Sequence, residues 1–196
     1  MKRVVGITGG ISSGKSNVCS VIKELGYPII DCDKITKDLS QIDGPIYNAI
    51  LKHFGPDYFL DNEELDRKKL GKLIFNNIES KVLLDKISHP LVKIELLNQL
   101  ESYKDGLVFI EVPLLYESGL DELCDNVICV FLPKELQIER LMARDNINYE
   151  YAIAKIDSQM DLYKKKILAD FVIDSRGSFD ETKSQVVKII NNIKGV

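Results

Sequence analysis

The sequence contains no apolar run that approaches the roughly 18 to 20 residues of a membrane-spanning helix, so it predicts no membrane contact. Its four cysteines show no C-x-x-C spacing and no paired histidines nearby, which argues against a zinc site and favours reduced, buried thiols. The net charge of −4 lacks the basic excess of a general nucleic-acid-binding protein. We therefore expect a cytoplasmic protein without nucleic-acid partners, in which a few local cations would still bind an anionic substrate.

Five short apolar runs predict β-strands, at residues 4–8, 27–30, 107–110, 127–132 and 171–173. The first run follows basic residues as in a signal peptide, but it stops early and no cleavage site follows, so a buried strand explains it better. After Lys15, apolar residues from Val18 to Leu25 follow helical spacing, and Gly26 ends that helix. We expect the 196 residues to form an α/β domain, a doubly wound parallel sheet of about five strands with helices on both faces.

Between about residues 35 and 103 the pattern is helical, with polar breaks at residues 43–45 and 55–57. The pair His89-Pro90 marks a kink or a new helix start in this region. Because one crossover between strands needs far less helix, we interpret the region as a helical insertion.

The residues Gly9–Ser16 match the phosphate-binding motif G-x-x-x-x-G-K-S/T. In such a loop the backbone N–H groups converge on phosphate oxygens, and the residues expected to supply them are Gly10, Ile11, Ser12, Ser13 and Gly14. Lys15 is expected to neutralise the β- and γ-phosphates of a nucleotide, and the Ser16 hydroxyl to ligate Mg²⁺. A glycine-rich turn that matches by chance is the alternative, but the predicted strand before the motif and the amphipathic helix after it favour nucleotide binding.

Carboxylates follow two of the predicted strands, at the edge of the sheet where ligands bind. Asp31 and Asp33 are two residues apart on an extended chain, so we expect their side chains to point the same way. Asp33 is the candidate base for an attacking hydroxyl, and Asp31 is expected to support Asp33 or the metal, with a helix N-cap and first-turn charge as the alternative. Glu111 ends another strand and is a candidate Mg²⁺ ligand through water, with a solvated strand end as the alternative.

Gln137, Arg140 and Arg144 are spaced to share one helix face. Two arginines one turn apart repel unless an anion lies between them, so both are candidates for binding phosphates and Arg140 for catalysis. A solvated basic face is the alternative. Lys164–Lys166 is the densest basic run, and we interpret it as solvated surface. The polar, helical region around these cations is typical of a lid that closes over nucleotide.

Together these motifs resemble the dephospho-CoA kinase family along nearly the whole chain. Residues 111–117, Glu-Val-Pro-Leu-Leu-Tyr-Glu, are similar to the family's D-V-P-L-L-F-E, and Asp31-Cys32-Asp33 is similar to its D-A-D. His89-Pro90 resembles an H-P pair in the family's substrate-binding insertion. Residues 137–144 resemble its Q-x-x-R-x-x-x-R element.

Three positions depart from the family's pattern. Glu111 replaces the usual aspartate and is one methylene longer, which could shift metal geometry. Lys155 stands where arginine is common, which removes a bidentate donor. Ser12 stands where the family usually has glycine, so its φ must be negative or strained.

The resemblance implies that ATP donates its γ-phosphate to the ribose 3′-hydroxyl of dephospho-CoA, giving CoA and ADP with Mg²⁺ as cofactor. It implies catalytic roles for Asp33, Lys15 and Arg140, and substrate contacts from Asp31, Asp33 and His89. For His89, an N-capping or core histidine is the alternative. The expected partners are ATP and dephospho-CoA, and the expected state is a monomer or weak homo-oligomer.

The resemblance also implies three subregions within a single domain of residues 1–196. They are a nucleotide-binding core at about 1–36, 104–139 and 167–196, a CoA-side helical insertion at about 37–103 and a lid at about 140–166. A kinase for a nucleoside monophosphate or a sugar is the nearest alternative, and the segment 111–117 and the long insertion disfavour it. A regulatory GTPase would need an N-K-x-D guanine-reading element, which the sequence lacks.

Overall fold

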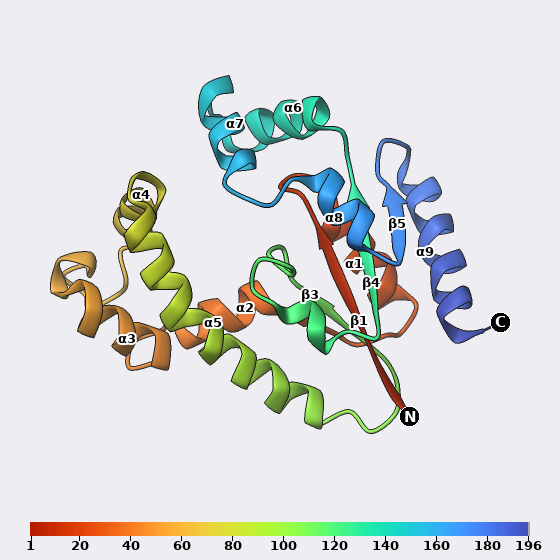
Figure 1. Ribbon diagram of the computed structural model, residues 1–196, viewed down its shortest axis with the longest axis horizontal. Helices are drawn as coiled ribbons and strands as arrows, with labels where there is room; N and C mark the ends of the chain where they lie inside the picture. The colour runs from red at the N-terminus through yellow and green to blue at the C-terminus, as the bar shows by residue number, and fades with distance from the viewer. Residues whose placement is uncertain (196) are drawn as a thin grey trace. The chain divides into compact units, whose positions relative to one another are not determined.

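The computed structural model describes residues 1–195 (Figure 1). The chain forms two compact units, Met1–Ile30 together with Tyr103–Val196, and Asp31–Ser102. The first unit is built on a β-sheet and the second on helices.

The sheet has five strands in the order β2-β3-β1-β4-β5. Their bounds are β1 Lys2–Gly9, β2 Ile29–Asp31, β3 Gly106–Glu111, β4 Asn126–Phe131 and β5 Phe171–Asp174. β1 pairs in parallel with β3 and β4, and β4 pairs in parallel with β5. The register places Ile7 of β1 beside Glu111 of β3, and Gly9 of β1 beside Val130 of β4. The carboxyl ends of β1, β3 and β4 therefore meet at one edge of the sheet. The five expected strands are confirmed.

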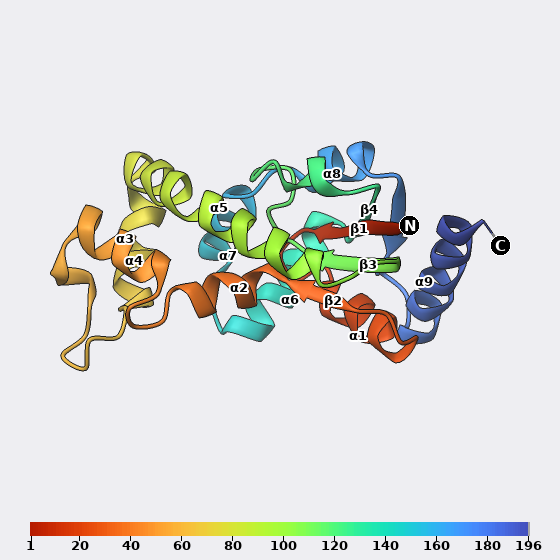
Figure 2. The same ribbon diagram turned by 90° about the horizontal axis from the view of Figure 1, so that it is seen from below.

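Helices cover both faces of these strands (Figure 2). On one face, α1 (Lys15–Glu24) and α9 (Phe179–Lys194) share a buried apolar cluster with β1, β3, β4 and β5. On the other face, Leu162 of α8 (Leu162–Leu168) packs against β4. Each fully buried Val, Leu, Ile or Phe side chain contributes about 1.5–3 kcal/mol. The expected doubly wound fold is confirmed, but Leu25, expected on the buried stripe of α1, is 40% exposed.

Three more helices complete this unit: η2 Leu120–Leu123, α6 Lys134–Asp145 and α7 Tyr149–Asp157. β4 leads into α6, so α6 and α7 lie beyond the carboxyl ends of the central strands (Figure 1). Leu141 of α6 packs with Ala152 of α7, and both are fully buried. The pair is therefore held together by its own small apolar cluster.

The second unit consists of α2 Cys32–Leu39, α3 Pro45–Phe54, η1 Pro56–Tyr58, α4 Arg67–Asn76 and α5 Ile78–Glu101. The long helix α5 contacts α2, α3 and α4. Pro90 lies inside α5, so the alternative of a new helix start at His89-Pro90 is wrong. The expected division into core, insertion and lid stays a prediction.

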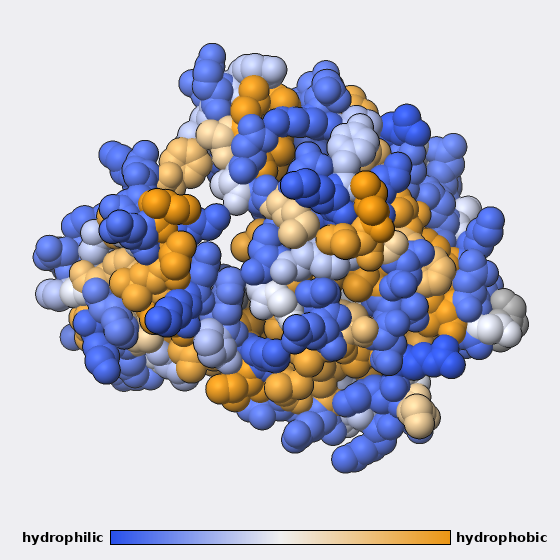
Figure 3. Space-filling model, viewed as in Figure 1, coloured by the Kyte–Doolittle hydropathy of each residue, from blue (hydrophilic) through white to orange (hydrophobic). Residues whose placement is uncertain are grey.

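Among residues 1–195, no helix is both long and apolar enough to cross a bilayer. On the face shown in Figure 3, hydrophilic side chains surround smaller apolar areas on both units.

Candidate functional site

The phosphate loop joins the central strand β1 to helix α1. β1 ends at Gly9 and α1 begins at Lys15, with Gly14 as the N-cap. Gly14 has a φ of 90°, a left-handed conformation that favours glycine. Its carbonyl oxygen accepts from the Asn17 N–H at 3.1 Å, which starts the helix. The loop therefore lies at the positive end of the helix dipole, where anions bind.

The Lys15 ammonium lies within the curve of this loop. Its Nζ donates to the carbonyl oxygens of Gly9 at 3.3 Å and Gly10 at 3.0 Å. The Ser13 N–H also donates to the Gly10 oxygen, at 3.2 Å. A positive charge is thus held beside the backbone groups that the motif uses for phosphate.

Gln137 packs against the loop from α6. Its side chain is 2% exposed, and its Nε2 donates to the Leu132 carbonyl oxygen at 2.9 Å. Its Oε1 lies 2.3 Å from the position that a Cβ on Gly10 would occupy. A side chain at residue 10 would therefore displace Gln137, so this glycine is required by close packing. Gln137 therefore packs against the phosphate loop and is buried, so it does not lie on a solvated helix face.

Ser12 stands where the family usually has glycine, and its backbone has the left-handed conformation that favours glycine. Its φ is 56°, so of the two expected possibilities the strained one holds. Its Oγ is buried and has no hydrogen-bond partner among the described residues. The loop therefore keeps its shape at a local energetic cost.

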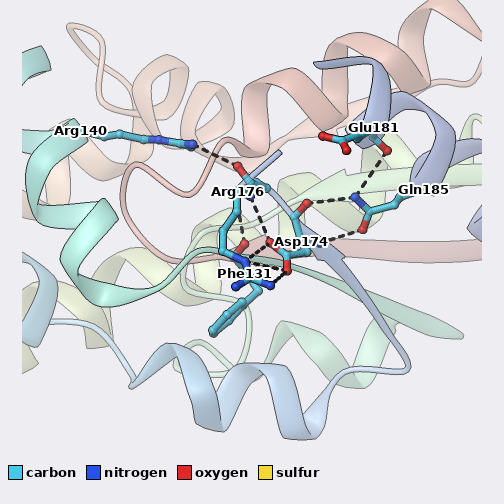
Figure 4. Close-up of polar contacts among 7 residues, drawn as sticks. Phe131, Arg140, Asp174, Arg176, Glu181 and Gln185 are labelled. Carbon is cyan, nitrogen blue, oxygen red and sulfur yellow. Dashed lines mark hydrogen bonds and ion pairs between the residues drawn. The ribbon is translucent and has the colours of Figure 1, made fainter. Parts of the chain in front are cut away.

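Ser175 connects Arg140 to the phosphate loop. The Ser175 hydroxyl can donate to either of two backbone carbonyl oxygens, that of Ser13 at 2.6 Å or that of Phe131 at 3.1 Å. The Arg140 Nη2 donates to the Ser175 carbonyl oxygen at 3.0 Å, and Figure 4 shows the guanidinium extending from α6 toward this segment. The Arg140 Nη1 lies 3.9 Å from the position of a Cβ on Gly14. The structure thus brings Arg140, a predicted phosphate-binding residue, to the phosphate loop. Ser175, which links the two, was not predicted, because no sequence pattern singles it out.

The residues beside Ser175 hold this segment in place (Figure 4). Arg176 Nη2 and Asp174 Oδ2 form an exposed ion pair at 2.6 Å. Hydrogen bonds from the Arg176 guanidinium hold the pKa of Asp174 below its usual range. Gln185 of α9 accepts from the Asp174 N–H and donates to the Asp174 carbonyl oxygen, both at 2.9 Å. The segment that anchors Arg140 is therefore fixed to α9.

Arg140 and Arg144 are both exposed, but they have different protein partners. The Arg144 side chain is 58% exposed, and its Nε contacts Asp145 Oδ1 at 2.7 Å. Lys155 Nζ contacts the other oxygen of Asp145 at 2.9 Å. Hydrogen bonds from Arg144 and then Lys155 lower the pKa of Asp145 far below its ordinary value. The two arginines thus have separate protein partners, and the role of Arg144 toward phosphates stays a prediction.

Glu111 lies against α1, near the end of the phosphate loop. Its carboxylate is close enough to Cys19 to act on the thiol, because burial and then this carboxylate raise the pKa of the thiol. Because Cys19 is one helical turn after Ser16, Glu111 lies against the helix face on which Ser16 stands. Among the residues described, no three His, Cys, Asp or Glu side chains gather as a metal site. One carboxylate and one hydroxyl nevertheless suit Mg²⁺, which keeps waters and takes phosphate oxygens.

Asp31 and Asp33 belong to the second unit. Asp31 ends β2 and caps α2, since its Oδ1 accepts from the Lys34 N–H at 3.0 Å. Asp33 is exposed in the first turn of α2. The expectation that both carboxylates extend from one strand is therefore wrong, because the helix begins between them. The N-cap alternative is correct for Asp31, and the first-turn alternative is correct for the position of Asp33, whose side chain is exposed.

His89 also lies in the second unit, in the interior of α5. Its Nε2 is 3.6 Å from Asp85 Oδ1, one turn earlier, and its side chain is 32% exposed. Both alternatives for this residue, an N-cap and a core histidine, are therefore wrong. A substrate contact stays a prediction.

The interpretation of Lys164–Lys166 as solvated surface is wrong for its central residue. Lys165 is fully buried, whereas its two neighbours are exposed. Its Nζ forms an ion pair with Glu117 Oε1 at 2.7 Å. Three adjacent lysines look alike in sequence, and only the phase of α8 separates them.

A phosphate loop between the central strand of a parallel sheet and a helix, with an arginine anchored at the loop, defines a P-loop nucleotide-binding protein of the kinase type. The chain belongs to the dephospho-CoA kinase family, whose model, described as dephospho-CoA kinase, matches residues 3–181. A dephospho-CoA kinase of Enterococcus faecalis is 43% identical over 190 residues, which are 96% of each chain.

Two solved structures resemble the whole chain. A dephospho-CoA kinase from Campylobacter jejuni is 34% identical, with a TM-score of 0.72 over 100% of this chain and 99% of that one. The protein TT1252 from Thermus thermophilus is 30% identical, with a TM-score of 0.85 over 98% and 97% of the two chains. The chain is therefore an ATP-dependent kinase by family, and the roles of its individual residues stay predictions.

Proposed function

We propose that this chain transfers the γ-phosphoryl group of ATP to the ribose 3′-hydroxyl of dephospho-CoA, the last step of coenzyme A biosynthesis. The hydroxyl oxygen forms the new bond to phosphorus, the bond to the β-phosphate oxygen breaks, and the hydroxyl proton is released. The observation that carries the proposal is the family match over residues 3–181, which includes a fully formed phosphate loop.

The loop and its cations supply the electrostatic part of the mechanism. The N–H groups of Gly10–Gly14 cradle the phosphates, and Lys15 balances the β- and γ-phosphate charge. Arg140, held by Ser175 at 3.0 Å, places a second cation at the same loop. Preorganised cations of this kind stabilise the charge that spreads over the transferring group. Arg144 is proposed as a supporting phosphate contact.

Asp33 is proposed to orient or deprotonate the attacking hydroxyl. Its place in the first turn of α2 leaves its carboxylate exposed. Asp31, which caps that helix, fixes the turn on which Asp33 stands. His89 is proposed as a substrate contact in the helical insertion.

Ser16 and Glu111 are the residues proposed to hold Mg²⁺, Glu111 through water. When bound, the ion neutralises phosphate charge. We further propose that the enzyme is cytoplasmic and acts as a monomer or weak homo-oligomer.

The direct test is ADP release from Mg-ATP with and without dephospho-CoA, with CoA measured by mass. We expect strong dependence on dephospho-CoA and one CoA for each ADP. ADP release that ignores dephospho-CoA, with no CoA formed, would send the acceptor assignment to another small-molecule kinase.

A further inference from the structure

Lys165 of α8 is completely buried, and the mechanism proposed above gives it no role. Its Nζ donates to the Pro113 carbonyl oxygen at 2.8 Å and pairs with Glu117 Oε1 at 2.7 Å. A buried charge is costly unless its partners are in place. Lys165 therefore stabilises one arrangement of the segments that carry those partners.

The first of these segments leads to the phosphate loop. The Pro113 carbonyl oxygen also accepts from Thr8 Oγ1 at 3.2 Å, and Thr8 is fully buried just before Gly9. The N–H of Val112 donates to the Ile7 oxygen at 2.9 Å, which extends the β1–β3 pairing past Glu111. Lys165 thus contacts the strand end from which the loop begins.

The second segment leads to the region between α7 and α8. The same Glu117 oxygen that pairs with Lys165 accepts from the Met160 N–H at 2.9 Å. Met160 lines a cavity of about 250 Å³ whose wall includes Gly10 of the loop and Gln137. A shift of residues 158–161 would therefore change the space directly beside the phosphate loop.

We propose that Lys165 and Glu117 are positioning residues for phosphoryl transfer. The pair holds Ser158–Asp161 against the loop, so that the cavity at Gly10 keeps the shape that excludes water from bound phosphates. The inference rests on the proposed function. Loss of the pair lowers transfer to the acceptor and lets water compete for the γ-phosphoryl group.

The test uses Lys165→Met, Glu117→Gln and the double variant. Lys165→Met alone leaves the Glu117 charge unpaired and is expected to fold poorly. The double variant carries no unpaired charge, and the amide oxygen that replaces the carboxylate can still accept from the Met160 N–H, so it is expected to melt within a few degrees of the wild type. Lys164→Met, which changes the exposed neighbour in the same helix, is the matched control.

We expect the folded double variant to show kcat for CoA formation lowered at least tenfold. We also expect several ADP released for each CoA formed, against about one for the wild type and Lys164→Met. Glu117→Gln, which keeps Lys165 and an acceptor for Met160, should fall between the wild type and the double variant.

Two results would overturn the inference, and they are distinguishable. If the folded double variant forms CoA at the wild-type rate and ratio, the pair serves stability alone and the proposed function stands. If the wild type itself forms no CoA, the proposed function fails and the positioning role fails with it.

Discussion

Ser12 shows how a single backbone angle can differ from what its residue type prefers. A non-glycine residue in the left-handed region costs about 1–2 kcal/mol because its Cβ crowds the following carbonyl. At Ser12 the φ is 56° and the hydroxyl is buried without a described partner. Neighbouring contacts, among them the one between Ser175 and the Ser13 oxygen, hold the loop in this shape.

Ser12→Gly should therefore stabilise the protein. Glycine removes the Cβ but loses about 0.5–1 kcal/mol of unfolded-chain entropy, so we expect the free energy of unfolding to rise by about 0.5–1 kcal/mol. Denaturant unfolding measures the change. Ser12→Ala is the control, since it removes the hydroxyl and keeps the Cβ. An equal gain in both variants would assign the cost to the buried hydroxyl.

Asp33→Asn tests the proposed base. The amide keeps the shape of the side chain but cannot accept a proton, and general base catalysis is typically worth 10²–10⁴-fold. We expect kcat to fall about 100-fold while ATP affinity changes little. Asp38→Asn, an exposed carboxylate in the same helix, should leave kcat unchanged. An unaltered kcat in Asp33→Asn would remove this carboxylate from the mechanism.

The sequence motif predicted the phosphate loop, but it did not predict two distant residues: Ser175, which contacts the loop, and Lys165, which contacts a segment hydrogen-bonded to the strand before it. Lys15 and Ser16 were found because their spacing follows from phosphate chemistry, which fixes side chains relative to one backbone turn. Ser175 and Lys165 act through contacts with segments 162 and 52 residues away along the chain. A lone serine and one lysine of three carry no local signature of such contacts.

At the scale of elements, one carboxylate, Asp145, pairs with two cations where α6 is followed by α7. Arg144 and Lys155, one from each helix, contact its two oxygens at 2.7 and 2.9 Å. Asn146, with a φ of 52°, ends α6 directly after it. The ion pairs therefore link the two helices where the chain changes direction.

These ion pairs should stabilise the protein in a pH-dependent way. The pKa of Asp145 is lowered in the folded state, so its contribution is present above the unfolded value of about 3.9 and is lost as pH falls through the folded value. We expect Asp145→Asn to destabilise by less than about 1 kcal/mol at pH 7, because the group is near solvent. The difference from wild type should shrink below about pH 4 and in high salt.

Unfolding of both proteins across pH measures this difference. Glu139→Gln, an exposed carboxylate in the same helix, is the control. A destabilisation by Asp145→Asn that is the same at pH 7 and at acid pH would show that the side chain acts by packing.

Periodicity predicted the elements well where one element has a single clear pattern. Strands buried on both sides read as continuous apolar runs, and all five were found. It failed at Asp31–Asp33, because a strand and a helix meet there within one residue and the capping hydrogen bond decides the boundary. At Pro90 only the expected new helix start is wrong, since α5 continues through a residue that often breaks helices, and the expected kink stays a prediction.

At the scale of the molecule, the order of the strands is what brings the site together. β3 follows β2 by more than seventy residues, yet it lies between β2 and β1 in the sheet. Its last residue, Glu111, therefore lies beside Ile7 near the phosphate loop. Apolar runs show that strands exist but carry no information on their neighbours, so this placement could not be predicted from periodicity.

Nucleotide binding should stabilise the whole molecule, because the phosphate loop exists only in the folded chain. A ligand at 100 times its Kd adds about 2.7 kcal/mol, and each kcal/mol raises Tm by about 2–4 °C in a domain of this size. We therefore expect saturating Mg-ADP to raise Tm by about 5–10 °C. Lys15→Ala should abolish most of the shift, since it removes the cation within the loop. Lys188→Ala, an exposed lysine on α9, should keep it.

The same melting experiment separates the metal from the nucleotide. If Ser16 and Glu111 hold Mg²⁺, a chelator should reduce the shift that ADP causes in the wild type. It should change the shift much less in Glu111→Gln, whose amide is a weaker partner for the water shell of a divalent ion. An identical response to the chelator in both proteins would exclude Glu111 from the metal site and leave the nucleotide held by the loop and its cations.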